Sequence, residues 1–551
     1  MMKQIFIIGV ALLTVCVMPT FSQVSNDNED EVNKIDTRWT QNDFVPGQVL
    51  VKFKDAQRVE VNTAHGQFRS TSVNRVTRAL QKYGAEEMEL LLPREIPHRK
   101  MRRTKAYNGD VIQERDLSQL YLVRLSNEHI QEAIQLVDEL NMIDEVEFAE
   151  PNYRVYAMAD INIADDSSGN PLEGQQWYLD AYGVKELWNK PIINKERPII
   201  AILDTGVDLT HPDLKDNLWT NTIEEYGTKD NDNDGNGFKN DVHGWDFVNN
   251  TANIRDNNMH GTHVAGIAAA ANNGIGIVGA NPQALIMPIT VLQSDGSGDV
   301  ATIVKGIEYA IHNGAIILNM SLGLYVNSQA LRQALESAYQ KAVLIAAAGN
   351  DGRCIYSSHW PIIHSEPKPQ PCFPAAYSFV LGVQATVKGG SLASYSNYDD
   401  DGAIFSCEST FFDPDGFNYE LKVPGSQMLS TIPGGGYKEL NGTSMATPLA
   451  AGAISALTMI KQYNTQEILW GDLLHTNNIA QAYNQTSRPA ELDLIRVELR
   501  ERKDLADITE DDYGGDNEVD AGETVNIYPV IRTTFGVANN INPGTLSVPE
   551  G

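Results

Sequence analysis

Basic residues and cysteines are scarce in this chain. Its 551 residues include 42 Lys and Arg against 72 Asp and Glu, which gives a formal net charge of −30. So acidic a chain is poorly suited to bind nucleic acid, and we expect no nucleic-acid partner. The four cysteines are too few for a disulfide framework. Cys354 and Cys372 bracket a proline-rich loop and are the predicted pair if a disulfide forms; the alternative is that Cys354, Cys372 and Cys407 all remain thiols.

Long apolar runs are missing after the first twenty residues. The chain opens with Lys3, an apolar run from Ile5 to Met18 and a short polar stretch, which is the order of a secretory signal peptide. We therefore predict a signal peptide over residues 1–22 and a protein that is secreted or held at the surface of a bacterium. The run is short for a transmembrane helix, and no later segment is long and apolar enough, so no membrane span is expected. Lipid attachment at Cys16 is an alternative that the bulky Val15 disfavours.

Residues 44–157 have the pattern of a small α+β domain. A polar linker at 23–43 precedes them, and strands and helices then follow in the order βαββαβ, with helices predicted over 70–84 and 126–140. This order is typical of a ferredoxin-like fold. A compact domain between a signal peptide and a larger body is where a propeptide would lie. The basic loop at 94–105 is either a solvated loop or a site of proteolytic cleavage.

Residues 158–505 have the pattern of an α/β domain. Short, wholly apolar strands such as "IIAILD" and "VLIAAA" alternate with helical segments, which indicates a parallel sheet covered by helices on both faces. Sites in such folds lie at the carboxyl ends of the strands, where Asp204, Ser321 and Asn350 fall. Residues 506–551 are acidic and are predicted to begin a β-rich segment that the chain does not complete.

The segment "NGTSMATP" places Ser444 in the first turn of an apolar helix predicted from Met445 onward. The unpaired N–H groups and the positive end of the helix dipole favour developing negative charge there, as a nucleophile requires. The alternative is a simple N-cap. Asp204 at a strand end and His260 at a helix start supply the carboxylate and the base of an Asp-His-Ser triad. Taken singly, His260 and its neighbour His263 would each be structural.

Three blocks of sequence resemble the subtilisin-like serine proteases, the subtilase family. They are "DTGVDLTHPDL" at 204–214, "HGTHVAG" at 260–266 and "GTSMATP" at 442–448, in the order that the family has. The resemblance implies a three-layer α/β catalytic domain and a serine endopeptidase that works through an acyl-enzyme. It makes Asp204, His260 and Ser444 the triad and Asn350 the oxyanion donor, although an asparagine before Asp-Gly is by itself typical of a turn. It also implies a propeptide that blocks the cleft and is removed by self-cleavage between Tyr153 and Asp165.

The same resemblance places a protein or peptide substrate between two segments, "DGSG" and "SLG", which would pair with its backbone as added strands. Pairing of this kind accepts many extended peptides. A third segment, "AAG", would form one wall of the pocket for the residue before the cleaved bond. The substrate-binding residues implied are Gly296, Gly298, Ser321, Leu322, Gly323, Ala347, Ala348 and Gly349.

Two structural calcium sites are predicted. The segment "DNDNDGNGFKND" has oxygen-bearing side chains at calcium-loop spacing and a glycine at the bend, the alternative being a merely acidic turn. Its candidate ligands are Asp230, Asp232, Asp234, Asn236 and Asp241. The second site follows from the resemblance alone and comprises the side chains of Asp213 and Asn273 with the backbone carbonyls of Ala271, Ile275 and Ile277.

Two other functions fit parts of the sequence. A catalytically inactive relative used as a binding module would lack a member of the triad, and none is missing. A calcium-binding adhesion protein would explain the acidic loop but not the three blocks. A serine-directed fluorophosphonate probe separates these hypotheses, because it labels an activated serine and ignores an N-cap.

Overall fold

A computed structural model describes most of the chain between residues 43 and 533. The described residues are 43–54, 59–64, 67–92, 103–106, 111–158, 165–166, 172–355, 371–399, 418–463, 466–473, 478–484, 492–501 and 525–533. The predicted signal peptide, nearly all of the polar linker and most of the basic loop lie outside them, as do Cys16, Cys407 and the acidic stretch at 511–523.

The amino-terminal domain is an antiparallel sheet with two helices. Its strands are hydrogen-bonded in the order β8-β1-β7-β4, which is the arrangement expected of the βαββαβ pattern. The elements are β1 (Phe44–Phe53), α1 (Asn74–Lys82), β4 (Ala85–Leu90), β7 (Leu120–Leu125), α2 (Ile130–Asn141) and β8 (Val146–Ala157). Two hairpins were not predicted: β2 (Val61–Ala64) with β3 (Gln67–Thr71), and β5 (Arg103–Lys105) with β6 (Val111–Gln113). The helix predicted from residue 70 begins later because β3 extends to Thr71, whose hydroxyl accepts a hydrogen bond from the N–H of Val73.

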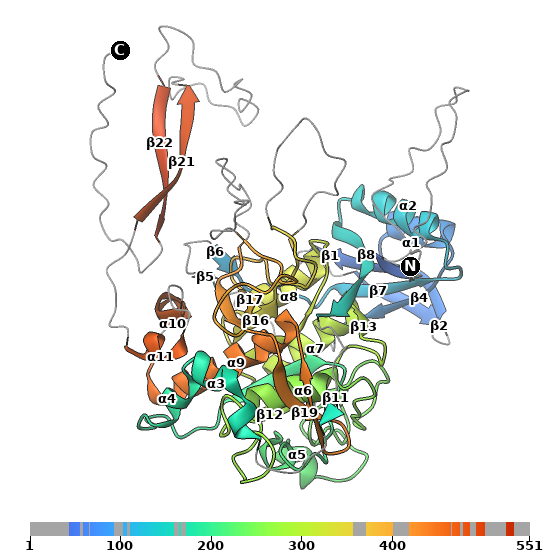
Figure 1. Cartoon of the computed structure of the whole chain (residues 1–551). Helices are drawn as coiled ribbons and strands as arrows, with labels where there is room; N and C mark the ends of the chain where they lie inside the picture. Colours follow the sequence, from blue (N-terminus) through green and yellow to red (C-terminus); the bar gives the residue numbers. More distant parts are fainter. Residues whose placement is uncertain are drawn as a thin grey trace, which may run out of the picture. The chain divides into compact units, whose positions relative to one another are not determined.

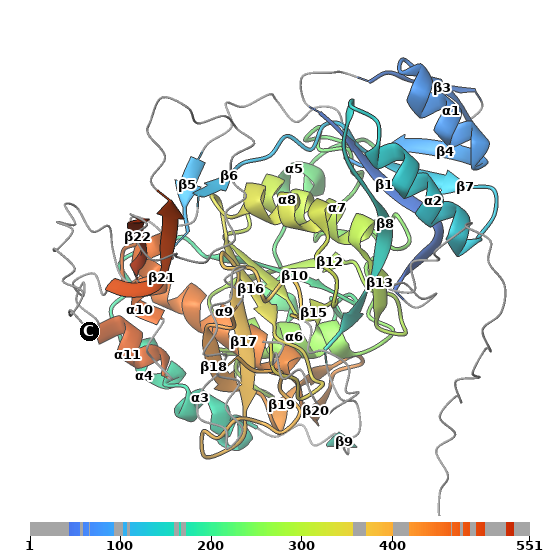
Figure 2. The same cartoon turned by 90° about the horizontal axis from the view of Figure 1, so that it is seen from above.

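The main domain is built on a seven-stranded sheet in which every neighbouring pair is parallel. In spatial order the strands are β11 (Trp245–Asp246), β12 (Leu285–Thr290), β10 (Ile199–Asp204), β14 (Ile317–Met320), β16 (Val343–Ala347), β17 (Leu381–Thr386) and β18 (Leu421–Pro424). Helices α6 (His260–Ala269) and α9 (Thr443–Ile460) pack together on one face, and α7 (Val300–His312) and α8 (Gln329–Ala338) pack together on the other (Figures 1 and 2). The three-layer α/β fold predicted from the apolar strands is therefore confirmed.

Helix α9 is the central helix of the core. Among the described helices it alone is long and apolar enough to cross a membrane, but 94% of that stretch is buried inside the domain. Its composition is that of a helix surrounded by protein on all sides. Ser444 lies in its first turn, as the sequence predicted.

Smaller elements complete the main domain. They are β9 (Asp165–Asp166), α3 (Trp177–Ala181), α4 (Val184–Trp188), α5 (Thr222–Glu225), β13 (Ser297–Asp299), β15 (Leu322–Gly323), β19 (Met428–Ile432), β20 (Gly436–Leu440), α10 (Gln466–Leu473) and α11 (Ile479–Asn484). A hairpin of β21 (Leu492–Glu501) and β22 (Val525–Thr533) follows, so β structure begins before residue 506.

The cysteines correct one prediction. Cys354 is disulfide-bonded, whereas Cys372 is a free and fully buried thiol. The predicted Cys354–Cys372 pair is therefore wrong, and the partner of Cys354 lies outside the described residues.

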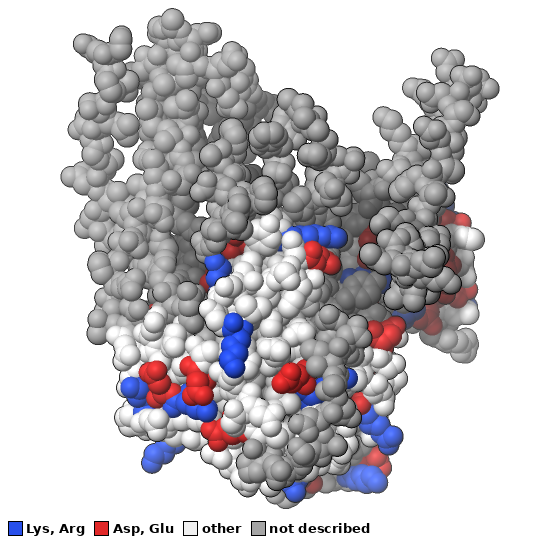
Figure 3. All heavy atoms as spheres, viewed as in Figure 1, with Lys and Arg blue, Asp and Glu red and all other residues white. Residues whose placement is uncertain are grey.

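The surface shown in Figure 3 carries acidic and basic side chains interspersed with uncharged ones. On the described part of this face the charges form no broad patch of one sign. A basic stripe of the kind that binds nucleic acid is not seen there.

Candidate active site

The end of one strand and the starts of two helices carry the three proposed catalytic side chains. β10 ends at Asp204, α6 begins at His260, and Ser444 is the second residue of α9. All three residues are almost completely buried. Nδ1 of His260 lies 2.6 Å from Oδ1 of Asp204. When Nδ1 carries the proton of this bond, Nε2 is left as the proton acceptor. Among the described residues Nε2 has no hydrogen-bond partner.

The electrostatics around His260 favour a basic imidazole. Burial lowers the pKa of His260, but the charge and the hydrogen bond of Asp204 and the charge of Asp256 raise it, and the net pKa lies above the ordinary histidine value. His263, one turn further along α6, differs. Burial lowers its pKa to about 3, and its Nε2 lies 2.8 Å from the carbonyl oxygen of Lys438. His263 is therefore a neutral, structural residue.

Ser444 is bonded through both its backbone and its side chain. Its N–H donates to the carbonyl oxygen of Met158 at 3.1 Å, and its hydroxyl donates to the carbonyl oxygen of Ser321 at 2.9 Å. The hydroxyl is thus held by the strand segment beside it and not by His260. Attack on a carbonyl would require the hydroxyl to exchange this bond for one to Nε2 of His260.

Asn350 follows β16 and faces the start of α9. Its side-chain oxygen accepts hydrogen bonds from both the N–H and the hydroxyl of Thr443, each at 2.9 Å. These bonds fix the amide beside Ser444. The same amide carries the Nδ2 donor that the resemblance assigns to the oxyanion.

The last strand of the amino-terminal domain runs through the site (Figure 2). β8 pairs antiparallel with β13, where Gly298 lies opposite Val155, and with β15, where Leu322 lies opposite Ala157. The N–H of Ala157 donates to the carbonyl oxygen of Gly296, and that of Met158 donates to the carbonyl oxygen of Ser321. The two segments predicted to bind an extended peptide therefore hold one on both sides.

The predicted wall residues occupy the end of β16. Ala347 closes this strand, the N–H of Ala348 donates to Val383, and Gly349 has φ +104°. A β-carbon at Gly349 would lie 2.3 Å from Nδ2 of Asn397 and 3.0 Å from the hydroxyl of Tyr325. This position therefore requires glycine on both steric and backbone grounds.

Asp256 is a residue of this site that the sequence analysis missed. Its carboxylate is largely buried and accepts hydrogen bonds from the hydroxyl of Thr205 and from the N–H of Met259. It also accepts bonds from the N–H and the hydroxyl of Thr262, at 2.8 and 2.6 Å. Asp256 thus connects Thr205, the residue after Asp204, to the first turn of α6. The sequence carries no clear signal for it, because Asp256 lies four residues before His260 and the N-cap position of α6 is Met259.

Some of the predicted calcium ligands of the acidic loop lie close together. Carboxylate oxygens of Glu224, Asp232 and Asp234 lie within 4.8 Å of one another, and Asn221 and Asn236 each donate to Asp234. Asp241 is buried below them and accepts from Asn236 and Tyr309. Asp230 instead pairs with Asn240 on the exposed side of the loop. Glu224 was missed because it precedes the loop and reaches it from α5.

The residues of the second predicted calcium site lie near one another. Asp213 is fully buried, and Asn273 lies 3.2 Å from its Oδ1. The N–H of Ala271 donates to the carbonyl oxygen of Asp213, and that of Ile277 donates to its carboxylate. Ile275 is bonded to the side chain of Asn273. The Asp213 carboxylate and the Asn273 amide are oxygen ligands that suit a hard cation such as Ca²⁺. The contacts of Ala271, Ile275 and Ile277 here are made by their N–H groups and not by the predicted carbonyls.

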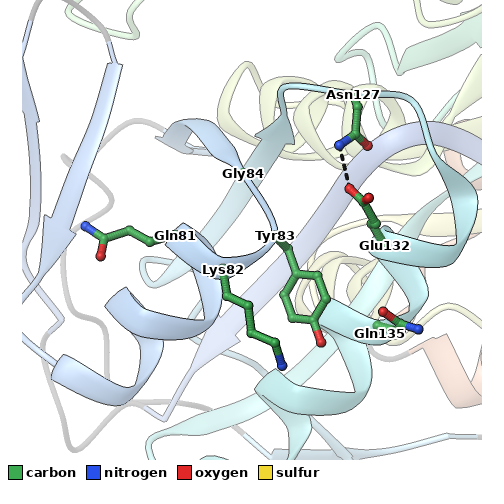
Figure 4. Close-up of a pocket in the computed structure, with 7 residues that line it drawn as sticks. All are labelled: Gln81, Lys82, Tyr83, Gly84, Asn127, Glu132 and Gln135. Atoms are coloured by element: carbon green, nitrogen blue, oxygen red, sulfur yellow. Dashed lines mark hydrogen bonds between the residues drawn. The ribbon is translucent and has the colours of Figure 1, made fainter.

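A hollow on the amino-terminal domain is lined by residues of that domain alone (Figure 4). Gln81, Lys82, Tyr83, Gly84, Asn127, Glu132 and Gln135 line it. Lys82 pairs with Glu139, and Asn127 donates to Glu132, so these polar groups bind one another. This pattern favours a structural role for the hollow.

Comparisons with known proteins agree with the geometry. The sequence profile described as "Subtilase family" matches residues 195–517. Thermitase of Thermoactinomyces vulgaris is 36% identical over 260 residues, which are 47% of this chain and 74% of that protein. Subtilisin Savinase of Lederbergia lenta is 34% identical over 292 residues, 52% of this chain and 85% of that protein. The crystal structure of fervidolysin from Fervidobacterium pennivorans, described as a keratinolytic enzyme related to subtilisin, matches with a TM-score of 0.55 and 20% identity. That match covers 84% of this chain but only 64% of the fervidolysin chain, and it supports the fold alone.

Proposed function

Because the chain belongs to the subtilase family of serine-type endopeptidases, we propose that Ser444, His260 and Asp204 are its catalytic triad and that residues 44–157 form its propeptide. The observation that carries this proposal is the pair of bonds at the site: Asp204 holds His260, and the N–H of Ser444 holds the carbonyl oxygen of Met158. Protein substrates are cleaved, and an acyl-enzyme forms at Ser444.

The proposed chemistry uses groups that are already in place. Nε2 of His260 takes the proton of the Ser444 hydroxyl as the oxygen attacks the peptide carbonyl, and later gives it to the leaving amine. Asp204 holds the productive tautomer and stabilises the cationic ring. The backbone N–H of Ser444 and the Asn350 amide donate to the oxyanion, and a donor of the Asn350 kind contributes roughly 3–4 kcal/mol of transition-state stabilisation, a magnitude measured in subtilisin.

The position of β8 supports a zymogen. Its backbone lies between β13 and β15 as a substrate would, and the carbonyl of Met158 accepts from the oxyanion donor at Ser444. We therefore assign the processing site to the bond after Met158, which lies within the predicted window from Tyr153 to Asp165. A serine-directed fluorophosphonate tests the enzyme itself: processed wild type should be labelled at Ser444, and absence of labelling would favour an inactive binding module.

The amino-terminal domain also binds two helices of the main domain at their N-termini. The carboxylate of Glu150 accepts from the hydroxyl of Ser328 and from the N–H groups of Gln329 and Ala330, at 2.8 to 3.0 Å. Asn152 accepts from the N–H of Ala301. These side chains from β8 satisfy orphan donors of α8 and α7, so the interface is specific and extends beyond the cleft.

We expect propeptide retention after cleavage to depend on Glu150 and on pH. Burial raises the pKa of Glu150 to about 6, although its three donors lower it. The group therefore binds a proton more tightly in the complex than when released, where its pKa is about 4.3. Its pH-dependent contribution is fully present below the released value and is lost as pH rises through 6. The difference between these two pKa values corresponds to about 2.3 kcal/mol, or roughly 50-fold in affinity.

Gel filtration of the cleaved full-length protein measures this prediction. The fragment should co-elute more completely near pH ~5 than near pH ~7, and Glu150→Ala should remove the pH dependence while weakening retention about 10-fold or more. Glu139→Ala is the matched control, because Glu139 pairs with Lys82 within the same domain. If propeptide retention depended on pH as strongly in the Glu150→Ala protein as in wild type, Glu150 would not be the group responsible.

Calcium is proposed as a structural ion at the two sites described above. Glu224, Asp232 and Asp234 would hold it in the acidic loop, and Asp213 with Asn273 and the loop after Ala271 would hold it in the second. The ion would neutralise clustered carboxylates and fix loops that contain no strand or helix of their own. It takes no part in the peptide cleavage.

Removing calcium should lower the melting temperature. A ligand at about 100 times its Kd stabilises the folded protein by roughly 2.7 kcal/mol, so a chelator should shift Tm down by several degrees. The double variant Asp232→Asn/Asp234→Asn should show a smaller calcium-dependent shift in calorimetry. Asp230→Asn is the matched control, since Asp230 lies outside the acidic group. If Tm changed neither on calcium removal nor in the double variant, the loop would not be a calcium site.

Secretion is proposed from the amino-terminal sequence and from the relatives, which include the "Minor extracellular protease Epr" of Bacillus subtilis. Fusion of residues 1–22 to a reporter, with export measured in a bacterial host, tests this proposal.

A further inference from the structure

The side chain of Met158, whose carbonyl oxygen accepts from the N–H of Ser444, is buried against one of the predicted substrate-binding segments. Met158 is only 9% exposed, although it follows the last residue of β8. Its backbone is fixed at both ends by Ser444 and Ser321, so its side chain has little freedom of placement. The position of this side chain therefore indicates where the substrate residue before the cleaved bond would bind.

Gly323 and Cys372 meet the methyl end of this side chain. A β-carbon built on Gly323 would lie 2.8 Å from Cε of Met158 and 2.5 Å from Sγ of Cys372. The methyl group and the thiol therefore both lie directly against Gly323. No other residue could replace this glycine without displacing one of them, because real contacts of a β-carbon are almost never so short.

Cys372 is held firmly at this point. Phe373, the next residue, exchanges two backbone hydrogen bonds with Leu324, at 2.8 and 2.9 Å, and the N–H of Cys372 donates to the hydroxyl of Tyr419. The thiol is fully buried, and burial raises its pKa, so it is neutral and behaves as a small apolar group. The nearest carboxylate that acts on it, Asp351, is engaged by the hydroxyl of Tyr325.

We propose that Cys372 and Gly323 set the length and the apolar character of the pocket at this position, so that the mature enzyme prefers substrates with methionine or a similarly sized aliphatic residue before the cleaved bond. The inference rests on the proposed function and narrows its substrate class. The Cys372 sulfur occupies the space that a large aromatic side chain would need, and neither Cys372 nor Gly323 offers a carboxylate to a lysine.

The rest of β8 indicates what else the substrate requires. Val155, three residues before Met158, is fully buried and lies opposite Gly298 in the paired strands. Tyr156 is 42% exposed. A substrate should therefore need a small aliphatic residue at the position of Val155 and tolerate wide variation at that of Tyr156.

A series of peptides tests the pocket. Processed enzyme would be given chromogenic substrates Val-Tyr-Ala-X in which X is Met, Leu, Phe, Trp, Lys or Ala, and kcat/KM would be measured for each. We expect Met and Leu to exceed Trp and Lys by at least about 10-fold, the range associated with a change of one or a few methylene groups in a pocket. Cys372→Gly should raise the ratio of Trp to Met by about 10-fold or more. Gly323→Ala should lower kcat/KM for Met more than for Ala at X.

Gly174→Ala is the matched control, since a β-carbon there would meet nothing within 4 Å. A wild-type enzyme that cleaves Trp or Lys peptides as well as Met peptides would overturn the inference, and so would a Trp-to-Met ratio that Cys372→Gly leaves unchanged. A processed protein that cleaves none of the peptides and ignores the fluorophosphonate would instead show that the proposed function has failed. The two failures are thus distinct.

Discussion

Ser444→Ala should keep its amino-terminal domain while the wild-type chain loses it. Self-cleavage requires the Ser444 hydroxyl to attack the carbonyl of Met158, whose oxygen already accepts from the Ser444 N–H. Alanine keeps that N–H and removes the nucleophile. We expect peptide hydrolysis to fall about 10⁶-fold, a magnitude taken from the corresponding substitution in subtilisin. Intact mass and N-terminal sequencing of proteins made in a protease-free system, with calcium present, measure the outcome. Wild type should begin at Ala159.

Ser455→Ala is the matched control for this experiment. Ser455 is a fully buried serine of the same helix, and its hydroxyl donates to the carbonyl of Gly452. The hydroxyl also accepts from Nδ2 of Asn281, so its loss should cost roughly 1–3 kcal/mol of stability and leave processing intact. Trimming of Ser444→Ala after Met158 would show that another protease matures the chain. If Ser455→Ala also stayed uncleaved, a folding defect and not the missing nucleophile would explain both variants.

The sequence predicted the main fold and the meeting of Asp204 with His260 because both depend on local patterns. Apolar strands alternating with helices require a doubly covered parallel sheet, and that sheet brings strand ends such as Asp204 and Asn350 to one edge. The two hairpins of the amino-terminal domain were missed because β2, β3, β5 and β6 have only three to five residues each. Such short strands carry too little alternation to be recognised.

Three other features depend on tertiary contacts and could not be predicted correctly from the sequence. Spacing placed Asp230 in the calcium loop, but its backbone turns it toward Asn240, and Glu224 reaches the loop from outside. Cys354 and Cys372 are neighbours among the cysteines of the sequence, yet Cys372 is held as a free thiol beside Gly323. The processing window could be predicted only to within a dozen residues. Its assignment to Met158 needed the hydrogen bond to Ser444.

Asp204→Asn should impair the site severely, though less than Ser444→Ala. The carboxylate accepts a hydrogen bond from Nδ1 of His260 at 2.6 Å and thereby leaves Nε2 free to act as the base. An asparagine can donate to the ring through its amide nitrogen and so favour the wrong tautomer. We expect kcat to fall about 10⁴-fold near neutral pH, as for the same change in a serine-protease triad.

The pH profile separates this role from a purely structural one. His260 acts as a base only when neutral, so kcat/KM of wild type should fall as pH drops through a pKa that lies above the ordinary histidine value of about 6.5. Burial lowers that pKa and the charges of Asp204 and Asp256 raise it, so removing the Asp204 charge should move the acid limb to lower pH. His263 should not contribute, since it stays neutral.

Asp256→Asn is the comparison variant. Asp256 bonds to Thr205 and Thr262 but not to the His260 ring, so the acid limb of this variant should move in the same direction by a smaller amount. An acid limb that stays in place in Asp204→Asn would mean that the carboxylate does not set the basicity of His260. Its 2.6 Å bond would then serve only to hold the ring.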